Sequence, residues 1–410
     1  MNEEALIQKK LINFREELST ELDKILVYWG NKTPDTVNGG FFGQLDARDQ
    51  PQAEAPKGSV LNARILWAFS AAFNLTGDGI YLQQAERACK YILDHFVDKA
   101  AGGVYWTVDY KGNKLDTKKQ VYASAFTIYA LAEYYRATRI KQVLDSAIAL
   151  YTVLEEKAYD RVYSGYFEAF TEDWSPIGDT RLSQKDVNVE KSMNTHLHVL
   201  EGYTNLYSIW PDAGLKGQIL GLLDNFSRHI IGSESATQTL FFDAAWTVRS
   251  ETISFGHDIE ASWLLLEAAR IISSEPLVRK FETVSLQLAE KVLGGLDQDG
   301  GLWYELEPAT ATLTKEKHWW VQAEAMVGFF NAWEISGRPV FLETSLRSWA
   351  YVQEKIIDKA GGEWHWGIQH DGTVMPGQDK AGIWKCPYHN SRACIELIRR
   401  ISLNAYLRKA

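Results

Sequence analysis

The sequence predicts an all-α protein built as an (α/α)6 toroid, a barrel in which six outer helices surround six inner ones. Two observations predict this fold. A short glycine–aromatic motif recurs six times at a near-constant spacing, and the segments between its copies have the apolar periodicity of helix pairs. Because the repeat runs through the whole chain, we expect residues 1–410 to form a single domain without an internal linker.

The motif consists of one or two glycines followed by aromatic or apolar residues. Its copies begin at residues 39, 102, 164, 239, 300 and 361, which gives intervals of 63, 62, 75, 61 and 61 residues. The fourth copy lacks the glycines and is the weakest. These segments are strand-like and lead into the inner helices, so we expect short β-hairpins at the end of the toroid where the inner helices begin, which we call the mouth.

Each interval between copies contains two helical segments. The first is apolar on almost every side, as expected of a buried inner helix, and the second carries charges on one face, as expected of an outer helix. The sixth interval holds one helix, and the unpaired N-terminal segment 3–26 supplies its partner. The predicted inner helices are 60–77, 120–138, 192–210, 256–272, 318–336 and 389–407, and the other outer helices are 80–96, 140–159, 213–230, 275–293 and 340–356.

The composition narrows the class of function. The chain has 410 residues with 43 Lys and Arg against 53 Asp and Glu, a formal charge of −10, which argues against binding to nucleic acid or to an anionic membrane. Neither a membrane span of roughly 20 apolar residues nor a signal peptide is visible, so we expect a cytoplasmic protein, and a monomer. The 15 Trp, 19 Tyr and 17 Phe exceed the needs of a core and suggest flat faces of the kind that bind sugar rings or bases.

The first turns of the inner helices predict the position of a site. All six begin at the mouth, so these turns should surround one pocket. A buried apolar helix has no packing reason to begin with histidine, glutamate or arginine. The polar and aromatic residues in or just before these turns are Asn62, Arg64, Tyr122, Ser124, Asn194, His198, His257, Glu260, Trp320, Glu324, Trp384 and His389.

Three histidines from three different repeats, His198, His257 and His389, are expected to meet at the mouth. His196 and His198 point about 200° apart around a helix, so only one of them can face inward. His198 shares a face with Asn194, so we place it inside and interpret His196 as structural. For the other histidines we expect ordinary structural or surface roles; they are His95, His229, His318, His365 and His370.

Imidazoles, rather than the carboxylate pair of an inverting glycosidase, are the conspicuous titratable groups. Two imidazoles on opposite faces of a substrate carbon could remove a proton from one side and return it on the other, which inverts a carbon next to a carbonyl. Arg64 and the helix N-termini would stabilise the enediolate intermediate. No dinucleotide or phosphate-binding glycine motif and no HExxH spacing occurs, so we expect neither a cofactor nor a metal.

Six segments together carry a resemblance to a known family. They resemble the N-acylglucosamine 2-epimerase superfamily and, within it, are most similar to cellobiose 2-epimerases. The resemblance implies a cofactor-free (α/α)6 isomerase that inverts C2 of the reducing-end glucose of β-1,4-linked disaccharides, such as cellobiose or lactose. The segments are LNAR (61–64), VYASAFTIYAL (121–131), NVEKSMNTHLHVLEGYTNLY (188–207), FGHDIEASWLL (255–265), HWWVQAEAMVGFFNAW (318–333) and WKCPYHNSRAC (384–394).

The resemblance also implies roles for single residues. His257 and His389 match the acid/base pair that acts on C2, and His198 matches a third histidine that assists ring opening and proton handling. Arg64 matches the arginine that holds the carbonyl and enediolate oxygens. The residues that match groups around the sugar are Tyr122, Asn194, Glu260 and Glu324, the aromatic platforms Trp320 and Trp384, and the loop acid Asp186.

Three alternatives stay open at this point. The same scaffold supports N-acylglucosamine 2-epimerases and aldose–ketose isomerases, which share the enediolate and differ in the step after proton removal. An (α/α)6 glycoside hydrolase would be favoured if Asp186, Glu260 or Glu324 formed a carboxylate pair at hydrolytic separation. A non-catalytic sugar-binding module would use the aromatic residues and leave the three histidines unexplained.

Overall fold

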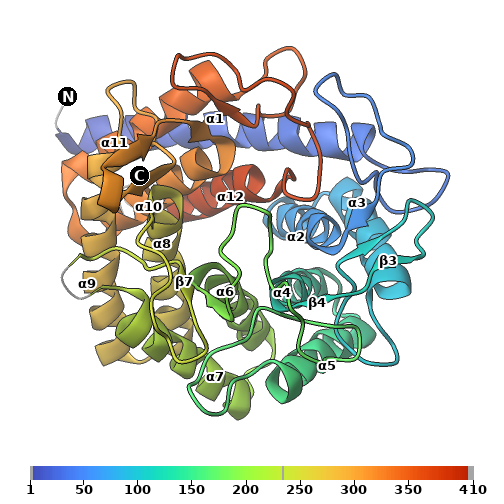
Figure 1. The fold of residues 1–410 in the computed structure, drawn as a ribbon. Coiled ribbons are helices and arrows are strands. Elements are labelled where there is room, and N and C mark those ends of the chain that lie inside the picture. The colour runs from blue at the N-terminus through green and yellow to red at the C-terminus, as the bar shows by residue number, and fades with distance from the viewer. Residues whose placement is uncertain (1–2, 233–234, 405–410) are drawn as a thin grey trace.

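Inner and outer helices alternate along the chain in the computed structural model, which describes residues 3–232 and 235–404 (Figure 1). Each inner helix contacts the next, and the last contacts the first, so the inner ring is closed. The inner helices are α2 (Ser59–Thr76), α4 (Val121–Thr138), α6 (Met193–Ile209), α8 (Phe255–Ile272), α10 (Trp319–Ser336) and α12 (Tyr388–Leu403). The outer helices are α1 (Glu3–Lys32), α3 (Gly79–Tyr91), α5 (Lys141–Lys157), α7 (Ala213–Asn225), α9 (Glu275–Val292) and α11 (Pro339–Tyr351).

The predicted (α/α)6 arrangement is confirmed, including the partnership of the two ends of the chain. Helix α1 packs against α12, as the unpaired N-terminal segment required, and continues six residues beyond its predicted end to Lys32. The last part of the predicted inner helix 389–407, residues 405–407, lies outside the described residues. Three outer helices widen into a π-type turn at their ends, at Ile92–Phe96, Phe226–Ile230 and Val352–Ile356.

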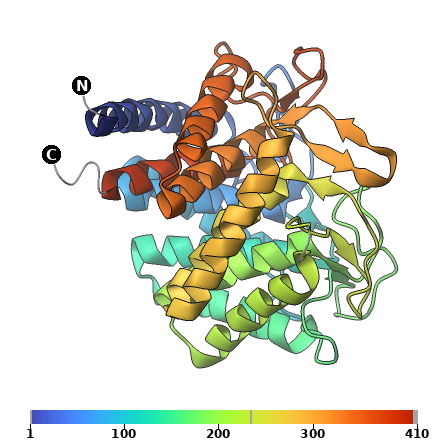
Figure 2. The same cartoon turned by 90° about the vertical axis from the view of Figure 1, so that its left-hand side faces the viewer.

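Short antiparallel strands and long loops gather at one end of the ring (Figure 2). Two pairings, β2 with β3 and β9 with β10, are the local hairpins that the sequence predicted. The other pairings join the segment before an inner helix to the motif of the next repeat. The strands are β1 (Lys57–Gly58), β2 (Thr107–Val108), β3 (Lys114–Asp116), β4 (Lys119–Gln120), β5 (Ala169–Phe170), β6 (Lys191–Ser192), β7 (Phe241–Phe242), β8 (Ile253–Ser254), β9 (Glu305–Glu307), β10 (Thr312–Thr314), β11 (Lys317–His318) and β12 (Gly367–Ile368).

The glycine–aromatic motif has a physical cause in a turn that recurs around the ring. In the second repeat Asp98 accepts hydrogen bonds from two backbone N–H groups of the turn and one from Lys119 Nζ at 2.7 Å. Gly102 and Gly103 follow with φ of 77° and 74°, which side chains other than glycine rarely adopt. Equivalent buried or half-buried pairs are Lys57–Asp35, Lys191–Asp160, Lys317–Asp297 and Lys380–Asp358.

The repeat with the weak fourth copy of the motif lacks both the lysine and the aspartate of this pair. Ile253 occupies the strand position that holds lysine in β1, β4, β6 and β11. Gly232 follows the bridge residue Ile231 where the other repeats have aspartate. Because a buried lysine without a counter-charge is costly, loss of one member of the pair favours loss of the other.

These strand pairs determine where the inner helices begin. Two strand residues lead directly into the first turn of each of α2, α4, α6, α8 and α10, so these first turns lie at the same end. The bodies of these helices are buried almost throughout, as the sequence predicted. Among the described residues, no helix combines the length and apolarity that a membrane crossing requires.

Candidate active site

A cavity of about 410 Å³ lies at the mouth of the toroid, within the range of pockets that hold small molecules. It is formed by the first turns of the inner helices and by the loop that contains residues 182–186. The predicted residues that line it are Arg64, Tyr122, Asp186, Asn194, His198, His257, Glu260, Trp320, Trp384 and His389. Asn62, Ser124 and Glu324, also expected at the mouth, do not line it; Asn62 instead donates to the backbone carbonyl of Gly58. Three imidazoles that are far apart in the sequence, those of His198, His257 and His389, therefore border one cavity.

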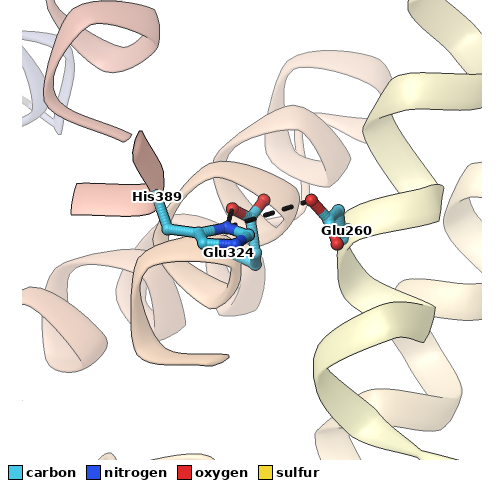
Figure 3. A group of neighbouring side chains, drawn as sticks. All are labelled: Glu260, Glu324 and His389. Carbon is cyan, nitrogen blue, oxygen red and sulfur yellow. Dashed lines mark hydrogen bonds and ion pairs between the residues drawn. The ribbon is translucent and has the colours of Figure 1, made fainter. Parts of the chain in front are cut away.

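His389 is held by a carboxylate on the neighbouring helix. Its Nδ1 lies 2.7 Å from Oε1 of Glu324 and 4.0 Å from Oε1 of Glu260. Figure 3 shows these three side chains facing one another. Burial, together with the positive charges of Arg64 and Arg392, lowers the pKa of His389 well below its usual value. The imidazole is thus neutral at pH 7, and its Nδ1–H donates to the carboxylate, which leaves Nε2 as the nitrogen that can accept a proton.

His198 has an arrangement of the same kind. Its Nδ1 lies 2.8 Å from Oε2 of Glu201, one turn further along α6, and its ring packs edge-on against Tyr122. Burial lowers the pKa of His198, and the adjacent Glu201 carboxylate opposes this shift in part. Burial alone would raise the pKa of Glu201, but Arg392 and the hydrogen bond from His198 bring it down to about 2.

His257 is placed by a hydroxyl group rather than by a carboxylate. It lies in the first turn of α8, where its Nδ1 is 2.8 Å from Oγ of Ser254. Its ring contacts Trp320 at 4.8 Å between centroids, and Trp320 contacts His389 at 5.6 Å, so both imidazoles border one indole. Burial, reinforced by the nearby His198, lowers the pKa of His257 to about 3.

Arg64 is the cation that faces the cavity from α2. Its Nη2 donates to the hydroxyl of Tyr122 at 2.7 Å, and Nη1 lies 3.8 Å from Sγ of Cys386. The guanidinium also stacks over Phe126, at 4.2 Å from the ring centroid. Packed between aromatic rings, Arg64 keeps its charge while remaining almost completely buried, and it can hold a sugar oxygen that becomes negative.

The remaining predicted residues form the rim. Asn194 lines the cavity, and its buried Oδ1 atom has no hydrogen-bond partner among the described residues. Asp186 accepts a hydrogen bond from the backbone of Ser183, which shapes the loop, and burial raises its pKa. Trp384 packs against Trp106 and Tyr122 and so presents a supported aromatic face.

Residues that sequence reasoning did not select complete the site. Tyr304 and His318 stack on each other at 4.1 Å and line the cavity, although His318 was expected to have an ordinary structural role.

His196 has the structural role that was expected of it, since its ring nitrogens lie within hydrogen-bond distance of the backbone of Ser192 and Tyr166. Arg392 was also missed, although its position three residues after His389 puts both on one face of a helix. Leu182, Ser183, Gln184, Lys185, Trp319 and Trp366 also line the cavity.

One group of side chains has the outline of a metal site. Glu260, Glu324 and His389 offer ligand atoms within 4.8 Å of one another. However, Nη2 of Arg392 donates to Oε1 of Glu260 at 2.5 Å and to Oε1 of Glu324 at 2.7 Å. The guanidinium thus already supplies the positive charge between these carboxylates, and a cation would have to displace it or lie beside it. This donor set does not fit a metal.

Comparison with known proteins identifies the family. The family model described as N-acylglucosamine 2-epimerase matches residues 40–393. The chain belongs to this family. It is 44% identical over 385 residues to the cellobiose 2-epimerase of Bacteroides fragilis, a match that covers 94% of this chain and 98% of that protein. The cellobiose 2-epimerase of Dictyoglomus turgidum is 39% identical over 92% of this chain and 96% of its own length.

A solved structure agrees with these relatives. The cellobiose 2-epimerase of Bacillus thermoamylovorans superposes with a TM-score of 0.91 at 40% identity, over 95% of this chain and 99% of that chain. N-acylglucosamine 2-epimerases are more distant relatives. The predicted family, the toroidal fold and the predicted class of enzyme, a carbohydrate epimerase and hence an isomerase, are confirmed.

Proposed function

We propose that this protein is a cellobiose 2-epimerase that reversibly inverts C2 of the reducing-end glucose of β-1,4-linked disaccharides. The observation that carries the proposal is the convergence of three neutral imidazoles, His198, His257 and His389, on one cavity of sugar-binding size. The 44% identity over nearly the whole chain to a protein of this name supports the choice of substrate.

In this proposal His257 and His389 act on C2 from opposite faces. One imidazole, neutral at pH 7, removes the C2 proton from the opened sugar and becomes an imidazolium. The other imidazole takes up a proton from water and donates it to the opposite face after the intermediate turns about C2–C3, and the first imidazolium then releases its proton to water. Because Glu324 accepts the Nδ1–H of His389, the imidazole has Nε2 free to exchange a proton with the sugar. Either histidine can serve as the first base, depending on the direction of the reaction.

The enediolate formed between these steps needs fixed positive charge. Arg64, with the hydroxyl of Tyr122 beside it, faces the cavity and can donate to the two oxygens of the intermediate. The first turns of the inner helices point their N–H groups towards the same end and add a partial positive charge. His198, held by Glu201, is placed to move the proton of the ring oxygen or of O1 during ring opening.

Trp320 and Trp384 provide the apolar faces on which the sugar rings lie. Asp186, Asn194 and Glu260 accept hydrogen bonds from the hydroxyl groups of the disaccharide. Since residues of one chain build the whole cavity, we also propose that the protein works as a monomer. The charge of −10 is consistent with a cytoplasmic enzyme that acts on a free disaccharide without nucleic acid or membrane partners.

The arrangement of Glu260 and Glu324 argues against hydrolysis by this pair of carboxyl groups. A hydrolase needs two carboxyl groups on either side of the scissile bond. Glu260 and Glu324 instead lie on one side, both bound to Arg392, and Glu324 does not line the cavity. An N-acylglucosamine epimerase or an aldose–ketose isomerase would use the same histidines, so the second candidate is an activity of the same kind on a different sugar.

The decisive experiment is product analysis by NMR in D₂O. The protein is incubated separately with cellobiose, lactose, N-acetylglucosamine and mannose. We expect cellobiose to gain deuterium at C2 and to yield a product that ends in mannose. Free glucose from cellobiose would indicate hydrolysis, and turnover of N-acetylglucosamine or mannose alone would assign one of the sister activities.

A further inference from the structure

A single buried arginine connects the carboxylates behind two of the three cavity histidines. Arg392 lies on α12, one turn after His389, and its side chain is 1% exposed. We propose that Arg392 is a positioning residue that couples His198 to His389, so that the orientation and proton affinity of both imidazoles depend on one guanidinium. The inference deepens the proposed function and rests on it.

The two ends of the guanidinium fork serve different histidines. Nη1 donates to Oε1 of Glu201, whose other carboxylate oxygen, Oε2, accepts from His198. Nη2 donates at 2.7 Å to Oε1 of Glu324, the same oxygen that accepts from His389. These contacts join distant parts of the chain, because Arg392 is 191 residues from Glu201 and 68 from Glu324.

Further contacts allow the guanidinium little freedom to move. Arg392 lies 4.9 Å from the ring centroid of Trp263 and 4.3 Å from that of Tyr388. The hydroxyl group of Tyr388 donates to Oε1 of Glu201 at 2.5 Å, so this residue supports both the arginine and its partner. A planar fork held in this way can bind two carboxylates at once, which a lysine ammonium group on a flexible chain cannot do with the same geometry.

The balance of charge explains why the arginine matters to the imidazoles. Three buried carboxylates, Glu201, Glu260 and Glu324, surround one guanidinium. Burial raises the pKa of Glu260 and of Glu324, and Arg392 opposes this rise. Without the arginine these groups would bind protons more readily. A protonated carboxyl group is a poorer acceptor for an Nδ1–H, so the tautomers of His198 and His389 would no longer be fixed.

Arg392→Lys and Arg392→Met test the proposal, with Arg400→Lys as the matched control. Arg400 lies on the same helix and is largely buried, but it pairs with Glu334 and Asn331, away from the cavity. We expect Arg392→Lys to lower kcat about 10²-fold, the scale of a misplacement of roughly 1 Å, with little change in KM. Arg400→Lys should leave both constants and their pH dependence close to those of the wild type.

The pH profile separates positioning from a merely structural role. Arg392 lowers the pKa of His198 and of His389 through its charge. In Arg392→Met the acidic limb of kcat/KM should therefore move to higher pH, whereas in Arg392→Lys, which keeps the charge, it should move less. The proposal would be overturned if the acidic limb lay at the same pH in the wild type, Arg392→Lys and Arg392→Met. It would also be overturned if the loss of kcat in the variants only matched their fraction of unfolded protein.

A second readout needs no substrate. In ¹⁵N-histidine spectra, assigned with His198→Gln and His389→Gln, the wild type should show one fixed tautomer with Nδ1 protonated for both residues. In Arg392→Met both signals should shift towards tautomer averaging while that of His257 stays. If both stay fixed, the inference fails. If the wild type does not epimerise any of the sugars, the proposed function fails and the spectra still decide the role of Arg392.

Should the arginine variants not fold, a double-mutant cycle replaces them. Glu201→Gln, Glu324→Gln and the double variant keep Arg392 and the shape of the side chains. If Arg392 couples the two carboxylates, the losses in kcat should deviate from multiplicativity by at least about threefold. Multiplicative losses would show that the two sides act independently and would overturn the proposal.

Discussion

The Nδ1 atom of His389 lies 2.7 Å from Oε1 of Glu324, although the two residues are 65 positions apart and belong to different inner helices. This relationship decides the tautomer of the imidazole and thereby which nitrogen faces the sugar. The carboxylate lies behind the histidine and does not line the cavity, so its contribution is separable from substrate binding.

Replacing Glu324 by glutamine should therefore lower kcat while leaving KM nearly unchanged. A hydrogen bond to a charged group contributes about 1.5–3 kcal/mol, which corresponds to a loss of about 10- to 10²-fold. Steady-state kinetics with cellobiose measures both constants. Glu334→Gln, on the same helix but paired with Arg400, is the control and should behave like the wild type. A rise in KM alone would mean that Glu324 binds the sugar directly.

Removal of either proposed acid/base group should abolish most of the activity. His257→Ala and His389→Ala are each expected to reduce the rate at least ~10²-fold, the usual loss for a general acid or base. Exchange of the C2 proton with D₂O, followed by NMR, is the direct measurement. His229→Ala is the control, because this ring stacks on Trp246 and does not line the cavity. Turnover like that of the wild type in either variant would exclude that histidine from the mechanism.

Chelation should not affect the activity. The carboxylates of Glu260 and Glu324, the only described acids that cluster with His389 as possible ligands, are both bound by Arg392. Exhaustive dialysis against EDTA is expected to leave kcat and KM unchanged. A reproducible loss that Zn²⁺ restores, and that other divalent ions do not, would contradict this and revive a metal site at these residues.

Removing the lysine from one of the buried lysine–aspartate pairs should strongly destabilise the protein. Lys119→Met leaves Asp98 buried without its counter-charge, so we expect a loss of about 3–5 kcal/mol in the free energy of unfolding. Urea denaturation measures it. Lys141→Met removes an exposed ion pair with Asp145 and should cost no more than about 1 kcal/mol. Similar losses in both variants would show that burial of the pair is unimportant.

Histidine burial should make the protein less stable in acid. Burial lowers the pKa of His196 to about 3, whereas its ordinary value is 6.5. Between these two pH values the unfolded chain binds the proton that the folded protein does not, so the free energy of unfolding falls as the pH decreases from 6.5 to 3. His196→Gln should reduce the slope of this dependence by about one proton. An unchanged slope in urea titrations would show that His196 is protonated in the folded protein.

The helical repeat could be predicted because it depends on the spacing of apolar residues within short segments of the sequence. The apolar surface of α10, which is buried on nearly every side, and the charged face of α9 follow from the period of about 3.6 residues within each segment. The glycine motif marks a turn that needs positive φ and so also shows in the sequence. Pairing of the strands between repeats, rather than only within hairpins, was less visible because two-residue strands carry almost no pattern of their own.

Residue type and position in the first turn of a helix were sufficient to select His198, His257 and His389, because a buried apolar helix has no packing use for them. The charged groups that surround these histidines in the folded protein could not be predicted in this way. The contacts of Arg392 with Glu201 and Glu324 join residues from three helices, and such contacts exist only once the ring has closed. Local patterns along the chain were thus enough to define the helices, their order and the three histidines at the mouth. The assignment of each carboxylate to the imidazole in front of it required the folded barrel, because that assignment depends on distances across the barrel axis and not on spacing along the chain.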